Sequence, residues 1–99
     1  MSQERIVSKE TVDRLIYFST FKYITEDQKK QCVGIIRSVL EDSFGYSRSQ
    51  INRWFMTPNI GLGDNEPRQL IGRGDGDLII KMLSETLVPT VGTGGALET

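Results

Sequence analysis

Few residues in this chain could perform chemistry. The sequence contains a single cysteine, Cys32, and no histidine. A zinc or copper cluster needs several such ligands, so no metal cluster of this kind is expected. The same absence excludes Ser-His-Asp and Cys-His catalysis, because histidine is the base in both. Only carboxylates, lysines and tyrosines remain as catalytic groups, and the composition therefore favours a binding protein over an enzyme.

Two further patterns resemble binding sites but have simpler explanations. Residues 72–76 read Gly-Arg-Gly-Asp-Gly, without the preceding strand or the final spacing of a dinucleotide-binding loop. The carboxylates of Asp64, Glu66, Asp75 and Asp77 do not alternate as the ligands of a calcium loop do. We expect these acidic residues to begin helices and to face solvent. No metal and no cofactor are therefore expected.

The length and the charge indicate one small domain. A chain of 99 residues can bury one hydrophobic core but not two. The 12 basic and 13 acidic residues leave a net charge of -1, which argues against binding nucleic acid or anionic lipid through bulk charge. No apolar run approaches the ~18 residues of a membrane span, and the first residues lack the pattern of a signal peptide. We expect a cytoplasmic protein that does not bind membranes.

Apolar periodicity predicts an all-α fold, a small bundle of about five helices with a flexible C-terminal tail. Residues 25–28 and 47–50 have the pattern of capping boxes, so helices are expected to begin there. Gly45 is expected to end the first of these helices, and Pro58 to end the second near Thr57. The other helices are expected from Ser8 to about Phe18, at residues 67–71, and along the apolar stripe Leu78, Ile79, Met82, Leu83 and Leu87 up to Val88. No strand alternation occurs.

The stretch between the short helices is expected to be ordered. Residues 58–66 contain two apolar residues, Ile60 and Leu62, which we expect to anchor this loop in the core. Trp54 and Phe55 lie at helical spacing from Ile51 and are expected to be core residues. Cys32 lies on a predicted buried stripe and is expected to pack as a small hydrophobic residue.

Several motifs follow one another from Phe44 to Leu87. They comprise Phe44-Gly45, the run from Trp54 to Pro58 and Asn59, then Gly61, Leu62 and Gly63, then Pro67 followed by Leu70 and Ile71, and Gly74 or Gly76 before a stripe ending at Leu83. In this order and spacing they resemble the toxin-binding domain of the Xre/MbcA/ParS-like antitoxins. The resemblance covers about residues 35–90.

The resemblance implies a non-enzymatic antitoxin that binds a RES-domain toxin, an NAD-degrading enzyme, and blocks its active site. It implies a helical extension at residues 1–34, a toxin-binding domain at 35–90 and a flexible tail at 91–99. In such pairs the C-terminal end of the antitoxin lies near the substrate pocket of the toxin. The partner-binding residues expected from it are Arg73, Met82, Val88, Val91, Gly94 and Leu97. The motif residues Trp54, Pro58, Asn59, Gly61, Leu62, Gly63, Pro67 and Leu70 are expected to be mainly structural.

Two other function classes remain open. Residues 47–55 carry Arg48, Gln50, Asn52 and Arg53, which are residue types that reach phosphates and base edges, so a small DNA-binding regulator is one alternative. The other is a helical interaction module, for example one encoded by a phage, that keeps the fold without a toxin. The sequence also leaves open whether the chain forms a homodimer.

Overall fold

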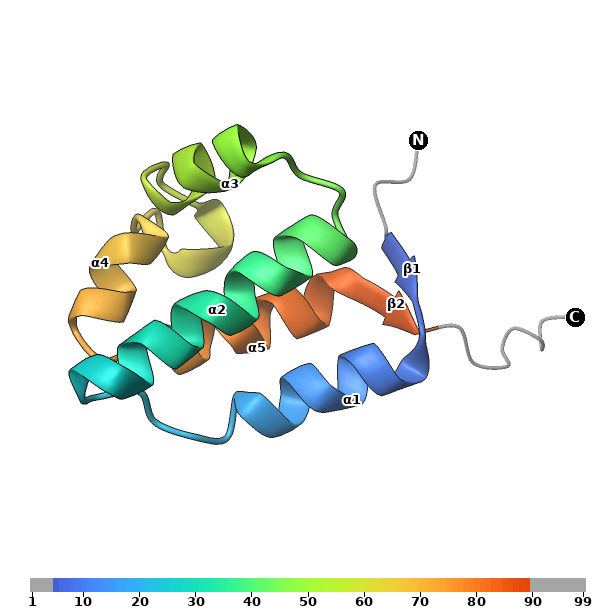
Figure 1. Ribbon diagram of the computed structural model, residues 1–99, viewed down its shortest axis with the longest axis horizontal. Coiled ribbons are helices and arrows are strands. Elements are labelled where there is room, and N and C mark those ends of the chain that lie inside the picture. The colour runs from blue at the N-terminus through green and yellow to red at the C-terminus, as the bar shows by residue number, and fades with distance from the viewer. Residues whose placement is uncertain (1–4, 90–99) are drawn as a thin grey trace, which may run out of the picture.

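The protein is an all-α bundle with a short two-stranded ribbon at one end (Figure 1). The structure, a computed structural model, describes residues 5–89. Its elements are β1 (Arg5–Val7), α1 (Lys9–Phe18), α2 (Glu26–Asp42), α3 (Arg48–Phe55), the 3-10 helix η1 (Ile60–Leu62), α4 (Pro67–Gly72), α5 (Gly76–Thr86) and β2 (Leu87–Pro89). The predicted all-α fold is confirmed, and the expected tail at residues 91–99 lies outside the described residues.

Helix α5 is the centre of the bundle. It packs against α1, α2, α4 and η1, and Figure 1 shows it running behind α2 and alongside α1. Its inward face carries Ile79, Ile80 and Leu83, which are almost fully buried. Residues from all five helices contribute to this one hydrophobic core. The expected division between residues 1–34 and 35–90 therefore falls inside α2, and α1 packs directly on α5.

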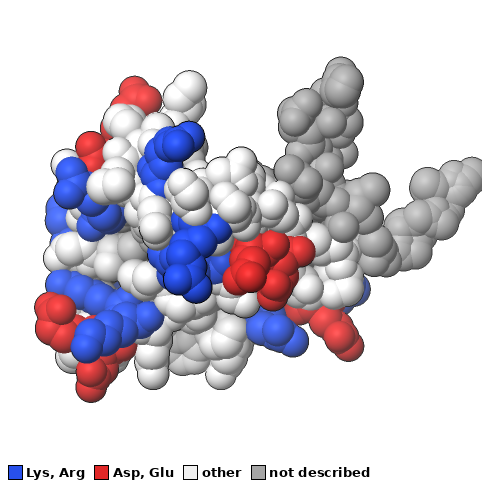
Figure 2. Space-filling view, turned by 45° about the horizontal axis from the view of Figure 1, so that its top comes forward, with Lys and Arg blue, Asp and Glu red and all other residues white. Residues whose placement is uncertain are grey.

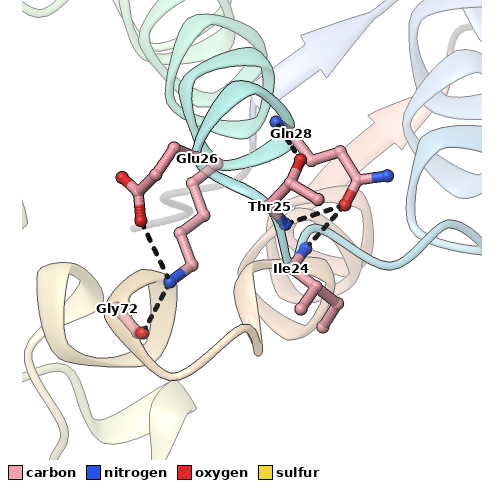
Figure 3. Close-up of polar contacts among 6 residues, drawn as sticks. Ile24, Thr25, Glu26, Gln28 and Gly72 are labelled. Atoms are coloured by element: carbon pink, nitrogen blue, oxygen red, sulfur yellow. Dashed lines mark hydrogen bonds and ion pairs between the residues drawn. The ribbon is translucent and has the colours of Figure 1, made fainter.

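The two predicted capping boxes are present. The Thr25 hydroxyl accepts a hydrogen bond from the backbone N–H of Gln28 at 3.1 Å, while the Gln28 carboxamide oxygen accepts from the backbone N–H groups of Ile24 and Thr25, both at 2.9 Å (Figure 3). Ser47 and Gln50 form the same reciprocal pair at the start of α3. These bonds satisfy backbone donors that a helix start leaves free, so they determine where both helices begin.

The first turn of α2 is also tied to the end of α4. The Lys29 ammonium donates a hydrogen bond to the carbonyl oxygen of Gly72 at 2.9 Å and lies 3.8 Å from a carboxylate oxygen of Glu26. Figure 3 shows Glu26 and Gly72 on opposite sides of this bridge. A cation is well placed at the last carbonyls of a helix, because the helix dipole is negative there. The contact joins residues that are far apart in the sequence.

The last helix is shorter than the sequence predicted. It ends at Thr86, not at Val88, and residues 87–89 form β2, which pairs in parallel with β1. The register places Arg5 opposite Leu87, Ile6 opposite Val88 and Val7 opposite Pro89. Leu87 is buried in an extended conformation. Strands of three residues are too short to show alternation, so this ribbon was not predicted.

Three apolar residues are more exposed than their patterns predicted. Leu62 is buried, but Ile60 is 89% exposed, so the expectation that both anchor the loop was wrong for Ile60. A 3-10 helix has three residues per turn, and positions two apart in η1 therefore point in different directions. Ile16 and Leu78 were expected to lie on the apolar stripes of their helices. They are instead 50% and 47% exposed.

Helices α2 and α5 approach each other very closely at Gly76. A Cβ atom at this position would lie 2.5 Å from the Cys32 sulfur and 3.6 Å from the Cys32 Cβ. Cys32 itself has no exposed surface. Only a residue without a side chain fits here, which explains a glycine in the first turn of α5.

We predict that Gly76→Ala lowers the free energy of unfolding by about 1 to 3 kcal/mol, the usual cost of overpacking a filled core. Gly72→Ala is the matched control, because a Cβ there meets nothing within 4 Å. It should leave stability unchanged or raise it by up to about 1 kcal/mol. Denaturant titration measures both values. In a Cys32→Ala background the Gly76 substitution should cost much less, and an equal cost in both backgrounds would contradict the proposed clash.

Candidate functional site

Several residues singled out from the sequence surround one open hollow on the surface. The hollow has a volume of about 440 Å³ and lies between η1, the end of α4 and the outer side of α5. Its lining includes Gly61, Leu62, Gly63, Leu70, Arg73 and Met82. The fold thus brings two of the expected partner-binding residues, Arg73 and Met82, next to four of the motif residues.

Asn59 holds the loop on one side of this hollow. Its side-chain oxygen accepts a hydrogen bond from the backbone N–H of Gly61 at 2.8 Å. Its backbone N–H donates to the Asn65 carbonyl at 3.1 Å, and its own carbonyl accepts from the N–H groups of Leu62 and Asp64, both at 2.9 Å. These bonds close residues 59–65 into a compact loop. The role of Asn59 in this loop is therefore structural, as expected.

The loop is pressed against α5. A Cβ atom at Gly61 would lie 3.2 Å from the Asn59 side-chain oxygen and 3.2 Å from the Cγ of Met82. Gly63 ends η1 in the left-handed conformation, with a φ of 67°. The Gly61-Leu62-Gly63 motif is thus explained by a close approach at its first glycine, burial of its leucine and a positive φ at its second glycine.

The lining of the hollow mixes apolar and charged residues. Apolar side chains are exposed at and beside it, with Ile60 at 89% and Leu78 at 47%, while Met82 is half-buried. Charged residues surround them, since Lys81 and Glu85 line the hollow and Arg73 lies 3.6 Å from Asp75. Within residues 5–89, no group of histidine, cysteine and acidic residues is arranged to hold a metal ion.

The remaining predicted residues are distributed elsewhere. Pro67 is buried at the first position of α4, where its missing N–H costs nothing, and Pro58 is exposed. Phe55 is buried, and Trp54 is half-buried against the same core with its ring centroid 5.5 Å from that of Phe55. The backbone of Val88 lies in β2. The other expected partner-binding residues, Val91, Gly94 and Leu97, lie outside the described residues.

The residues that motivated the DNA-binding alternative are partly engaged within the protein. The Gln50 carboxamide accepts a hydrogen bond from the Ser47 backbone, and the Asn52 side chain accepts one from the Arg37 guanidinium at 3.1 Å. Figure 2 shows lysine and arginine side chains interspersed with acidic and neutral ones across the face that it displays. This face therefore does not present one continuous basic patch, which is what a phosphate backbone requires.

The surroundings of Cys32 favour packing and disfavour reaction of its thiol. Burial, together with the smaller effect of the nearby Asp77 carboxylate, raises the pKa of its thiol from an ordinary value of 9.0 to about 12. A thiol reacts as its thiolate, which this environment disfavours. The expectation that Cys32 is a small hydrophobic residue agrees with its complete burial against Gly76.

Sequence reasoning missed one surface, the open groove between α1 and α2. Its lining includes Phe21, which is 42% exposed, and Tyr17, whose ring contacts that of Phe21, is 60% exposed. A signal was present in the sequence, because Ile16, Tyr17 and Phe18 are consecutive apolar residues, which point in different directions on a helix and cannot all face one core. Excess apolar residues of this kind indicate a second apolar surface on the same helix.

Comparison with family models, with curated proteins and with solved structures finds no match to this chain. Its function is therefore inferred from its own residues and geometry. Among the described helices, none combines the length and the apolar character needed to cross a bilayer.

We predict that Cys32 in the folded protein reacts with a thiol reagent at pH 8 about a thousandfold more slowly than free cysteine, because its thiolate fraction is that much smaller. Reaction with a chromogenic disulfide, followed by absorbance, measures the rate. The same protein in denaturant is the control and should react at the rate of free cysteine. Rapid and complete reaction under native conditions would show that the thiol is accessible and ionised.

Proposed function

We propose that this chain is an antitoxin-like binding protein that neutralises a RES-type, NAD-degrading toxin by blocking its active site, and that it performs no reaction itself. The observation that supports this proposal most is the convergence of Arg73 and Met82 on the hollow beside the Gly61-Leu62-Gly63 loop. The sequence resemblance had marked these residues from separate segments. A shared surface is what a common partner would need.

The hollow suits docking because it is both rigid and partly apolar. Its loop is closed by the hydrogen bonds of Asn59, and its other side is the central helix α5. A surface that is already ordered loses little conformational entropy on binding, so more of the contact energy is retained in the complex. Leu78 supplies exposed apolar area in the lining, and the exposed Lys81 supplies a charge that can pair with a partner carboxylate.

In this proposal the C-terminal residues obstruct the toxin. The β1–β2 ribbon determines where the chain leaves the bundle, since Pro89 is held opposite Val7. We propose that residues 91–97 then enter the substrate channel while the hollow holds the body of the toxin. Fixing a residue costs about 1 to 2 kcal/mol of conformational entropy, so the docking surface would carry most of the affinity.

We predict that Leu78→Glu weakens inhibition of a purified RES-domain toxin at least about tenfold, because a charge replaces an apolar side chain that lines the hollow, at a cost of about 1.4 kcal/mol or more. The measurement is NAD consumption by the toxin at increasing concentrations of each variant. Ile16→Glu is the matched control, since Ile16 is 50% exposed on α1 and does not line the hollow. Circular dichroism checks that both variants fold. Full inhibition by Leu78→Glu would contradict docking through this hollow.

We also predict that a chain truncated after Pro89 stays folded but inhibits the toxin much less than the full chain. The truncation leaves β1 and β2 paired, so thermal unfolding should be nearly unchanged. Binding measured by calorimetry should persist, because the docking surface is retained. If the truncated chain inhibits as well as the full chain, residues 90–99 have no part in the obstruction. If the full chain neither binds nor inhibits any such toxin, the proposed function is wrong.

A further inference from the structure

A larger hollow separates α1 from α2. This groove has a volume of about 800 Å³, and it is lined by α1, the loop after α1 and one side of α2. Leu15 and Val39 lie buried at its base, and Phe18 and Ile35 are half-buried along its walls. It shares no lining residue with the hollow beside η1. Within the described residues, nothing fills it.

The α2 wall of the groove contains a glycine that the fold itself does not require. Gly34 lies in the middle of a helix, where glycine costs roughly 0.5 to 1 kcal/mol relative to alanine. A Cβ atom at this position would meet nothing within 4 Å, and the φ of Gly34 is not positive. Ser38, another small residue, lines the groove one turn further along. Small residues on an open helix face allow another backbone to approach closely.

The mouth of the groove exposes an apolar edge. Phe21, which lines the groove, is 42% exposed, and the neighbouring Tyr17 is 60% exposed. The rings of Tyr17 and Phe21 meet edge to face with centroids 5.0 Å apart, so they hold each other in place. Single exposed apolar residues are ordinary, but an aromatic edge beside an apolar groove is typical of an interaction site.

The charges of the two walls are complementary. On the α1 side the charged lining residues are Arg14 and Lys22, and on the α2 side the charged lining residue is Asp42. Lys22 is already engaged, 3.1 Å from the buried Asp77 carboxylate. Arg14 forms no ion pair within residues 5–89, and Asp42 accepts only a hydrogen bond from Ser38. The groove thus carries positive charge on its α1 side and negative charge on its α2 side.

We propose that this groove is the site at which a second copy of the chain docks. In a two-fold arrangement each copy contributes both a groove and an aromatic edge, so the edge of one copy enters the groove of the other. The α1 wall of each copy then faces the α2 wall of the other, which places Arg14 of one near Asp42 of the other. One symmetric contact covers Tyr17 and Phe21 and occupies the open space over Gly34. This inference is independent of the identity of any toxin.

The test is the molar mass of the full chain in solution, measured by sedimentation equilibrium over a wide concentration range. The wild-type chain should associate reversibly to a dimer. Gly34→Leu should weaken dimerisation at least about tenfold, because its side chain fills the space that the second copy needs. Gly72→Leu is the matched control, since Gly72 also has open space around it but lies on α4, outside the groove. It should dimerise as the wild type does.

Both variants should remain folded, because a Cβ atom at either position meets nothing within 4 Å and both residues are exposed. A reciprocal charge exchange gives a second measurement. Arg14→Glu and Asp42→Arg should each weaken the dimer, and the double variant should recover most of the lost affinity. A wild-type chain that stays monomeric at every concentration overturns the proposal. The groove would then have to bind a different protein. A dimer that Gly34→Leu does not weaken overturns it as well.

Discussion

The close packing of α5 against α2 is the constraint on which the rest of the structure depends. Gly76 allows the backbone of α5 to lie against the Cys32 sulfur, and the inward residues Ile79, Ile80 and Leu83 then enter one continuous core. A core this small stabilises a protein by only a few kcal/mol in net terms, so a misfit of one methyl group is a large fraction of the total. Each of the other helices packs around this central pair.

The same packing positions the hollow beside η1. Because α5 is held from within, its outer side presents Met82 to the loop that Asn59 closes. The loop contributes backbone and glycines, while α4 and α5 contribute Arg73 and Met82. A surface assembled from three segments exists only when all three are in place. Its geometry is therefore a direct consequence of the core, even though its residues face solvent.

The two candidate surfaces lie on different parts of the bundle. The hollow is built by η1, α4 and α5, whereas the groove is built by α1, α2 and the loop between them. Because they share no lining residue, a partner on one does not need to displace a partner on the other. A small chain with one core can in this way carry two interactions, since docking uses surface that folding leaves exposed.

Local sequence signals determined where most helices begin and end. The capping boxes at Thr25 and Ser47 and the left-handed Gly45 were predicted because such bonds and dihedral angles involve neighbouring residues only.

Tertiary structure decided the rest. Val88 looked helical, but pairing with residues near the start of the chain converts residues 87–89 into a strand. Ile60 looked like an anchor, but in the 3-10 helix it points in a different direction from Leu62, and only Leu62 is buried. The convergence of Arg73 and Met82, and the open space over Gly34, depend on how helices pack across the core, and no local pattern contains that information.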